Sequence, residues 1–129
     1  MMIRSVVVLG ILLIGLANIL AQGGKAEPKR IEFSPGKSRI TLTRSLSNGS
    51  EMEYVFAARK GQRVTIKNST ASLFDFRVFN NEFDFETEFE SSPTLTFEIP
   101  ETGDYLLFVR KKMVAKPRIA RFSITLAIK

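Results

Sequence analysis

The sequence contains no cysteine, no histidine and no tryptophan in 129 residues. Without cysteine the chain forms no disulfide, so buried side chains alone must stabilise it. The absence of cysteine and histidine excludes zinc sites built from them, Ser–His triads and Cys–His nucleophiles. It also excludes the cysteine-linked lipid of a bacterial lipoprotein. We therefore expect a protein that is not an enzyme and that needs no cofactor and no metal.

The beginning of the chain has the features of a secretory signal peptide. Arg4 precedes seventeen residues without a charge, 5–21, most of them apolar, and a polar stretch follows. Cleavage after Ala21 is our first prediction, and cleavage after Ala26 is the alternative. An uncleaved membrane anchor is the competing interpretation, because seventeen residues reach the lower end of membrane-spanning length.

These features divide the chain into a signal peptide (1–21), a flexible leader (22–30) and one domain (31–129). The remaining length suits a single domain with one core and leaves no room for a second. We expect a periplasmic or secreted protein with no stable membrane span after cleavage.

The domain has the pattern of short strands rather than helices. Seven segments alternate or run apolar, are rich in Ile, Val, Thr and Phe, and are separated by turn residues. They are 39–46, 53–58, 62–68, 74–80, 94–100, 104–111 and 120–129. Strands of this length and spacing predict an all-β fold, a single antiparallel β-sandwich of about eight strands with the phenylalanines inside.

One further segment concentrates acid in a basic chain. Five of the thirteen acids lie between Glu82 and Glu90, alternating with Phe83, Phe85 and Phe89. A strand here would bury the phenylalanines on one face and leave the acids on the other. The acids are then either a solvated face that discourages edge-to-edge association, or a patch for a cationic partner. A calcium site and a pair of glycosidase carboxylates are weaker alternatives, because no calcium-loop spacing is present and a small domain offers little room for a sugar cleft.

The opposite charge gathers near the C-terminus in a chain of net charge +6. Six Lys and Arg fall between Arg110 and Arg121 without an acid, around Pro117. Nucleic acid is not the expected partner, because the predicted signal peptide implies secretion and no aromatic residue stands between the cations. The segment is therefore either a solvated loop or a loop that inserts into an acidic or polar cleft of a partner.

Three segments, 54–66, 100–109 and 121–129, resemble the periplasmic inhibitors of g-type lysozyme. The likeness extends upstream to residues 31–33 and so covers nearly the whole predicted domain. A broader likeness exists to bacterial pre-peptidase C-terminal domains, which are β-sandwich modules. The resemblance implies an all-β fold and a protein that binds a partner without catalysis.

The resemblance also implies two groups of partner-binding residues. In lysozyme inhibitors a turn with hydroxyl, glycine and tyrosine faces the enzyme, and here Thr102, Gly103 and Tyr105 match it; ordinary turn chemistry is the alternative interpretation. In the g-type inhibitors two arginines of the last long loop enter the enzyme cleft. The residues available in that loop here are Lys111, Lys112, Lys116 and Arg118.

Two positions depart from the g-type pattern. Gly49 stands where that family has an aromatic residue, and Met113 stands near the first of its arginines. The sequence thus predicts a lysozyme-inhibitor-like protein whose loops occlude a muramidase cleft. The alternative is a structural or carbohydrate-binding module of the cell envelope, similar to pre-peptidase C-terminal domains, and a calcium-dependent adhesion module comes third.

Overall fold

The computed structural model describes residues 28–90 and 92–129, so the predicted signal peptide and its cleavage sites lie outside the described residues. The described part contains nine strands and no helix. The strands are β1 (Lys29–Arg30), β2 (Arg39–Ser47), β3 (Glu51–Ala58), β4 (Arg63–Asn68), β5 (Phe74–Asn80), β6 (Phe85–Glu86), β7 (Thr94–Glu98), β8 (Gly103–Lys111) and β9 (Ile119–Ile128). No helix in the described residues is long and apolar enough to cross a membrane.

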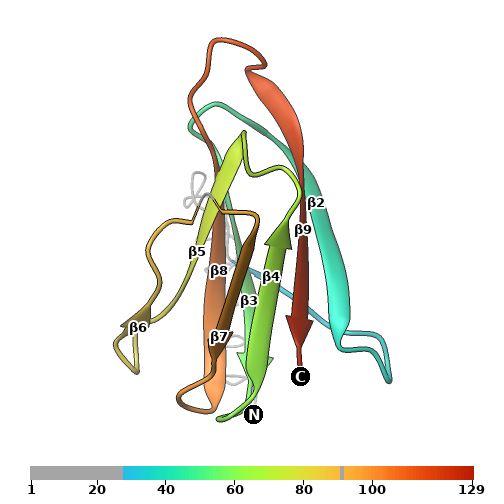
Figure 1. Ribbon diagram of the computed structural model, residues 1–129, viewed down its shortest axis with the longest axis vertical. Coiled ribbons are helices and arrows are strands. Elements are labelled where there is room, and N and C mark those ends of the chain that lie inside the picture. The colour runs from blue at the N-terminus through green and yellow to red at the C-terminus, as the bar shows by residue number, and fades with distance from the viewer. Residues whose placement is uncertain (1–27, 91) are drawn as a thin grey trace, which may run out of the picture.

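The strands form two sheets whose long strands run along the long axis of the molecule (Figure 1). One sheet has the order β1-β3-β8-β5-β6 and the other has the order β2-β9-β4-β7. All neighbours are antiparallel except β1 and β3, which are parallel. The predicted all-β, two-sheet architecture is confirmed, and the sandwich is mostly rather than wholly antiparallel. The strand β1 lies at the end of the predicted leader (22–30), where Arg30 also pairs with Asp104 at 2.6 Å.

The core lies between the two sheets and follows from the alternation within each strand. In β9, Phe122, Ile124 and Leu126 are fully buried, whereas the residues between them face outward. The ring of Phe122 contacts Tyr54 of β3 with a centroid distance of 6.4 Å and Phe74 of β5 with a distance of 5.5 Å. Aromatic rings from both sheets therefore meet in the interior, in place of a disulfide.

The acidic segment is the edge of the first sheet, and one extra residue interrupts its pairing. Glu86 lies opposite Phe79, and Glu90 lies opposite Phe76. The acidic segment therefore advances four residues between these two pairs, whereas β5 advances three. At the interruption the hydroxyl of Thr87 accepts a hydrogen bond from the backbone N–H of Val78 at 2.9 Å. Such an extra residue is a β-bulge, and it reverses which face the following side chains occupy.

The bulge corrects one sequence prediction. Phe85 packs inward against Tyr105, with ring centroids 5.6 Å apart. Phe89 instead contacts Phe108 on the outer face, and the guanidinium of Arg110 lies 3.6 Å from the Phe89 ring centroid. The prediction that Phe83, Phe85 and Phe89 share one face is therefore wrong for Phe89.

We expect Phe85→Ala to lower the free energy of unfolding by about 2–3 kcal/mol, because the ring is half-buried against Tyr105 and Phe97. Glu86→Ala should change the free energy of unfolding by no more than about 0.5 kcal/mol. The Glu86 side chain is 69% exposed, and its ion pair with Arg77 is long, at 3.6 Å, so the pair contributes little. Denaturant unfolding of both variants measures the difference. Equal losses would show that the two side chains do not lie on different faces.

Candidate protein-binding site

The two predicted groups of partner-binding residues lie at opposite ends of β8. Thr102, Gly103 and Tyr105 lie at its start, and Lys111 is its last residue. A strand of nine residues spans roughly 26 Å at about 3.3 Å per residue. Figure 1 shows the β7–β8 turn at the lower end of the molecule and the β8–β9 loop at the upper end. The two groups therefore do not form one continuous surface.

The group at the start of β8 is occupied by contacts within the domain. The Thr102 hydroxyl accepts a hydrogen bond from the backbone N–H of Lys60 at 2.9 Å. Gly103 leaves no room for a side chain, because a Cβ there would lie 2.8 Å from the ring of Phe83. Tyr105 is fully buried and its hydroxyl donates to the carbonyl of Glu101 at 2.6 Å. Burial raises the pKa of Tyr105, which keeps this donor protonated.

The stretch 102–105 is therefore accounted for by turn and core chemistry. Tyr105 stacks on Phe56 with centroids 5.9 Å apart and offers no ring to a partner. Of the three predicted residues only Thr102 is exposed, and its oxygen is already an acceptor. The ordinary turn interpretation fits these contacts, and the binding interpretation finds no free group among the three except that hydroxyl.

At the other end, Lys111 is the buried base of the β8–β9 loop. Its side chain is 1% exposed, and its ammonium donates to Asn48 Oδ1 at 2.7 Å and to the carbonyl of Lys112 at 3.0 Å. Asn48 in turn donates from Nδ2 to the carbonyl of Val114 at 2.6 Å. The backbone N–H of Asn48 also donates to the carbonyl of Arg118 at 2.9 Å. These bonds join the β2–β3 turn to both halves of the loop.

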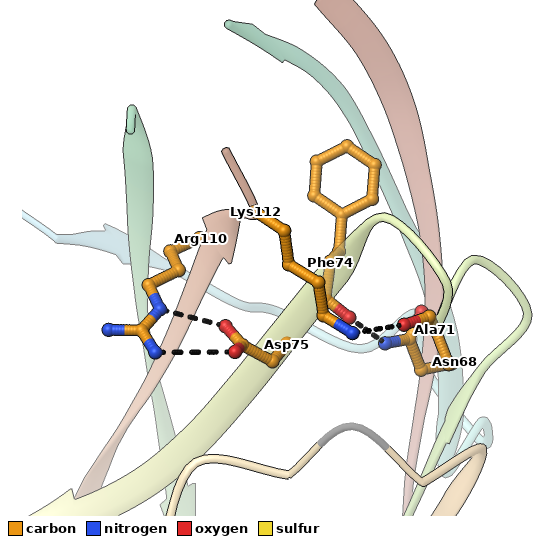
Figure 2. A network of polar contacts seen from close by, with 6 residues as sticks. All are labelled: Asn68, Ala71, Phe74, Asp75, Arg110 and Lys112. Carbon is orange, nitrogen blue, oxygen red and sulfur yellow. Dashed lines mark hydrogen bonds and ion pairs between the residues drawn. The ribbon is translucent and has the colours of Figure 1, made fainter. Parts of the chain in front are cut away.

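Lys112 fixes the same loop to the β4–β5 turn. Its ammonium donates to the carbonyl of Ala71 at 3.0 Å, and its backbone N–H donates to the carbonyl of Leu73 at 2.9 Å. Figure 2 shows Lys112 reaching Ala71 beside Asn68, whose Nδ2 donates to the carbonyl of Phe74 at 3.0 Å. Lys111 and Lys112 therefore position the loop and do not project from it.

Arg110 completes this base on the outer face of the first sheet. Its guanidinium makes two hydrogen bonds to the carboxylate of Asp75, at 2.9 and 3.3 Å (Figure 2). Asp75 is buried, so this bidentate pair is shielded from water on the acid side. The end of β8 is thereby tied to the start of β5.

The exposed tip of the loop combines cations with apolar side chains. Lys116 and Arg118 are exposed, as expected from the sequence. Met113 is 78% exposed and Ile119 is 67% exposed, and they are the large hydrophobic residues on the surface of the described part. Gly49 lies beneath the tip, where a Cβ would lie 4.0 Å from the sulfur of Met113. We call Met113, Lys116, Arg118 and Ile119 the loop tip.

The sequence predicts the two cations of the loop tip but not its apolar members. Met113 stands out in the sequence only as a departure from a family pattern, and Ile119 adjoins a predicted strand. The short apolar run from Met113 to Ala115 inside a basic loop is the signal that indicates such a position. The pairing of Asn48 with Lys111 is also absent from the sequence prediction, because nothing local indicates a bond between residues so far apart in the chain.

The acidic residues do not contribute to this end. Asp84, Glu86 and Glu88 are exposed along the β6 edge, and Asp84 has a positive φ of 56° in the turn before β6. Among residues 28–90 and 92–129, no three acidic side chains come together in a way that could hold a metal ion. The loop tip therefore combines exposed cations with exposed apolar side chains, and the acidic edge does not share this combination.

The fold is a β-sandwich of one five-stranded and one four-stranded sheet. No family model and no curated protein sequence matches the chain. Among solved structures it resembles a periplasmic inhibitor of g-type lysozyme from Aeromonas hydrophila, with a TM-score of 0.66 and 23% identity over 79% of this chain and 96% of that one. The corresponding inhibitor from Salmonella Typhimurium gives 0.66 and 21% over 81% and 100%.

A second kind of neighbour confirms the broader likeness. The pre-peptidase C-terminal domain of a Bacillus anthracis collagenase has a TM-score of 0.52 and 15% identity, over 81% of this chain and 97% of that one. The resemblance seen in the sequence is therefore confirmed at the level of the fold. At sequence identities of 15–23% these structures show the fold alone, so the function has to be argued from the residues of this chain.

Proposed function

We propose that this chain is a non-catalytic, lysozyme-inhibitor-like protein whose loop tip enters the cleft of a muramidase. The observation that carries the proposal is the loop tip itself, where exposed Lys116 and Arg118 stand between exposed Met113 and Ile119. Its fold is similar to that of proteins described as periplasmic inhibitors of g-type lysozyme. We propose the same periplasmic or secreted location for this chain.

The base of the loop suits insertion into a cleft. Hydrogen bonds from Asn48, Lys111 and Lys112 hold both halves of the loop before any partner arrives. A loop fixed in this way loses less conformational freedom on binding than a mobile one, so more of the contact energy appears as affinity. At the tip, Lys116 and Arg118 can approach acidic groups at the bottom of a cleft while Met113 and Ile119 displace water from its walls.

The target differs from that of the g-type inhibitors in this proposal. Gly49 offers no side chain where those proteins carry an aromatic residue, and Met113 replaces a cation. We therefore expect weak or no inhibition of goose-type lysozyme, and stronger inhibition of a chicken-type or invertebrate-type enzyme. Lysis of bacterial cells by each enzyme class, with and without the purified protein, measures this selectivity. Nanomolar inhibition of the goose-type enzyme by the unmodified protein would contradict it.

The loop tip is tested by a charge-matched pair of variants. Lys116→Ala with Arg118→Ala should weaken inhibition by at least about thirtyfold, because a cation facing a desolvated carboxylate contributes about 2–5 kcal/mol when truncated. Arg59→Ala with Lys60→Ala removes one arginine and one lysine at the opposite end and should leave inhibition within about twofold. Equal losses in both pairs would show that general positive charge, and not the loop tip, carries the effect.

The alternative function is a module of the cell envelope, favoured by the similarity to a pre-peptidase C-terminal domain. It predicts that no class of lysozyme is inhibited by the unmodified protein. Lysis assays with the three enzyme classes therefore separate the two functions directly.

A further inference from the structure

A second surface of the molecule lies on the outer face of the sheet β2-β9-β4-β7. Four cations surround a hollow of about 420 Å³: Arg39 of β2, Arg63 and Lys67 of β4, and Lys129, which directly follows the end of β9. This face is separate from the loop tip, because Ile119 begins β9 and the residues of the hollow lie around the other end of that strand, from Thr125 to Lys129. The proposed function makes no use of it.

Strand register explains why the face is hollowed. Ala127 lies between Arg39 of β2 and Thr65 of β4, so a small side chain forms the floor between two longer ones. At the end of the hollow, Lys129 and Arg63 are joined by two backbone hydrogen bonds of 3.0 and 3.2 Å. Lys67 closes the other end beside Thr125. The cations therefore stand around the floor rather than in one row.

The positive charge of the hollow is not neutralised by the protein. The described residues contain three ion pairs, and none of them includes Arg39, Arg63, Lys67 or Lys129. The acid nearest in register is Glu98, opposite Arg63 on β7, and no ion pair joins them. Four like charges around one concave surface produce a positive potential that attracts anions.

Hydroxyl groups fill the space between the cations. Thr41 and Thr125 lie side by side with their oxygens 3.0 Å apart, and Thr65 lies in the next row across the sheet. The outer face continues with Thr43, whose hydroxyl accepts a hydrogen bond from Arg121 at 2.9 Å. Each hydroxyl can both donate and accept, so the face offers partners to the hydroxyl groups of a sugar as well as to an anion.

We propose that this hollow binds an anionic polysaccharide, with carboxylate, sulfate or phosphate groups on the cations and sugar hydroxyls on the threonines. The spacing supports a repeating ligand: Arg63 and Lys67 are four residues apart on β4, about 13 Å, and Arg39 lies two strands, about 9.6 Å, across the sheet from β4. Charges separated by such distances match a chain of charged sugars better than a single small anion. Charge complementarity identifies the class of ligand, an anionic polysaccharide, and the binding experiment identifies the sugar.

Two other polyanions fit the surface less well. Single-stranded nucleic acid is held largely by stacking on aromatic rings, and none of the residues around the hollow is aromatic. An anionic membrane surface favours basic residues beside apolar side chains that enter the lipid, and the one apolar residue of the hollow, Ala127, lies on its floor. Both remain useful as competitors in the test.

The test measures binding of heparin and polygalacturonate to the purified protein by calorimetry, at about 50 and 200 mM NaCl. We expect both glycans to bind, more weakly at the higher salt concentration, and neutral dextran not to bind. Arg63→Ser, Lys67→Ser and Lys129→Ser together should weaken binding by about tenfold or more. A control variant with Lys29→Ser, Lys116→Ser and Arg118→Ser loses the same number of lysines and arginines elsewhere and should stay within about twofold.

A second variant tests whether the glycan binds in the hollow itself or is only attracted by the positive charge of the surface. Ala127→Gln fills the floor without changing the charge and should also weaken glycan binding by about tenfold, while circular dichroism and lysozyme inhibition stay unchanged. The proposal is overturned if Ala127→Gln has no effect, or if both triple variants lose affinity equally. It is also overturned if oligothymidylate or vesicles of anionic lipid bind more tightly than either glycan.

Discussion

Phe122→Ala is expected to lower the free energy of unfolding by about 4–5 kcal/mol, near the upper end of what truncation of a buried aromatic ring costs. The ring is fully buried in β9 and contacts Tyr54 and Phe74, which belong to two strands of the opposite sheet. Its removal leaves a cavity where the two layers meet, and the backbone of the central strand β9 cannot move in to fill it. Since no disulfide is present, most of the stability of a domain of this size would be lost.

Urea unfolding followed by circular dichroism measures this loss, and Ile119→Ala is the matched control. Ile119 begins the same strand but is 67% exposed, so its truncation should cost no more than about 0.5 kcal/mol. Removal of similar amounts of stability by both variants would contradict the arrangement of the core. If Phe122→Ala does not fold, Phe122→Leu should still fold with a smaller loss.

Asn48→Leu is expected to cost about 3 kcal/mol, although the side chain is only half-buried. The change leaves the buried ammonium of Lys111 with one acceptor instead of two and the carbonyl of Val114 without its donor. A buried charged group that loses a partner costs more than the same hydrogen bond contributes when both partners are present. The loop tip should also lose its fixed position, so inhibition should weaken together with stability.

The double variant Asn48→Leu with Lys111→Met isolates the cause. It removes the stranded ammonium along with its acceptor, so at least half of the lost stability should return. Chemical unfolding of both single variants and of the double variant completes the cycle. If the double variant loses as much unfolding free energy as the two single variants lose together, the two side chains do not interact.

The strand plan could be predicted because alternation and turn residues are local signals. The segments predicted at 39–46, 74–80 and 104–111 correspond to β2 (Arg39–Ser47), β5 (Phe74–Asn80) and β8 (Gly103–Lys111) to within one residue at each end. In β2 polar residues face outward between inward apolar ones, whereas the outer faces of β5 and β8 also carry the half-buried Phe79, Leu106 and Phe108. Each segment is bounded by Gly, Pro or Asn nearby. In strands of this kind the hydrophobic pattern determines the register.

The candidate site was less predictable because it depends on contacts between distant segments. Lys111 belongs to a run of basic residues in the sequence, yet its side chain is buried and donates to Asn48. Tyr105 matches a binding motif, yet the same alternation puts it in the core. The bulge at Thr87 has no local signature either: the backbone N–H of Val78 donates to the Thr87 hydroxyl in place of a backbone carbonyl, and no sequence pattern indicates this bond. Only the exposed cations of the loop tip follow from the sequence alone.

The buried amide of Asn68 has a consequence for how the protein can be produced. Asn68, Ser69 and Thr70 form an acceptor sequence for N-linked glycans, which attach to the amide nitrogen of the asparagine. That nitrogen donates to the carbonyl of Phe74, and the side chain is 1% exposed. A sugar added to the nascent chain in a eukaryotic secretory pathway would prevent the β4–β5 turn from closing, so bacterial expression is the suitable route to the folded protein.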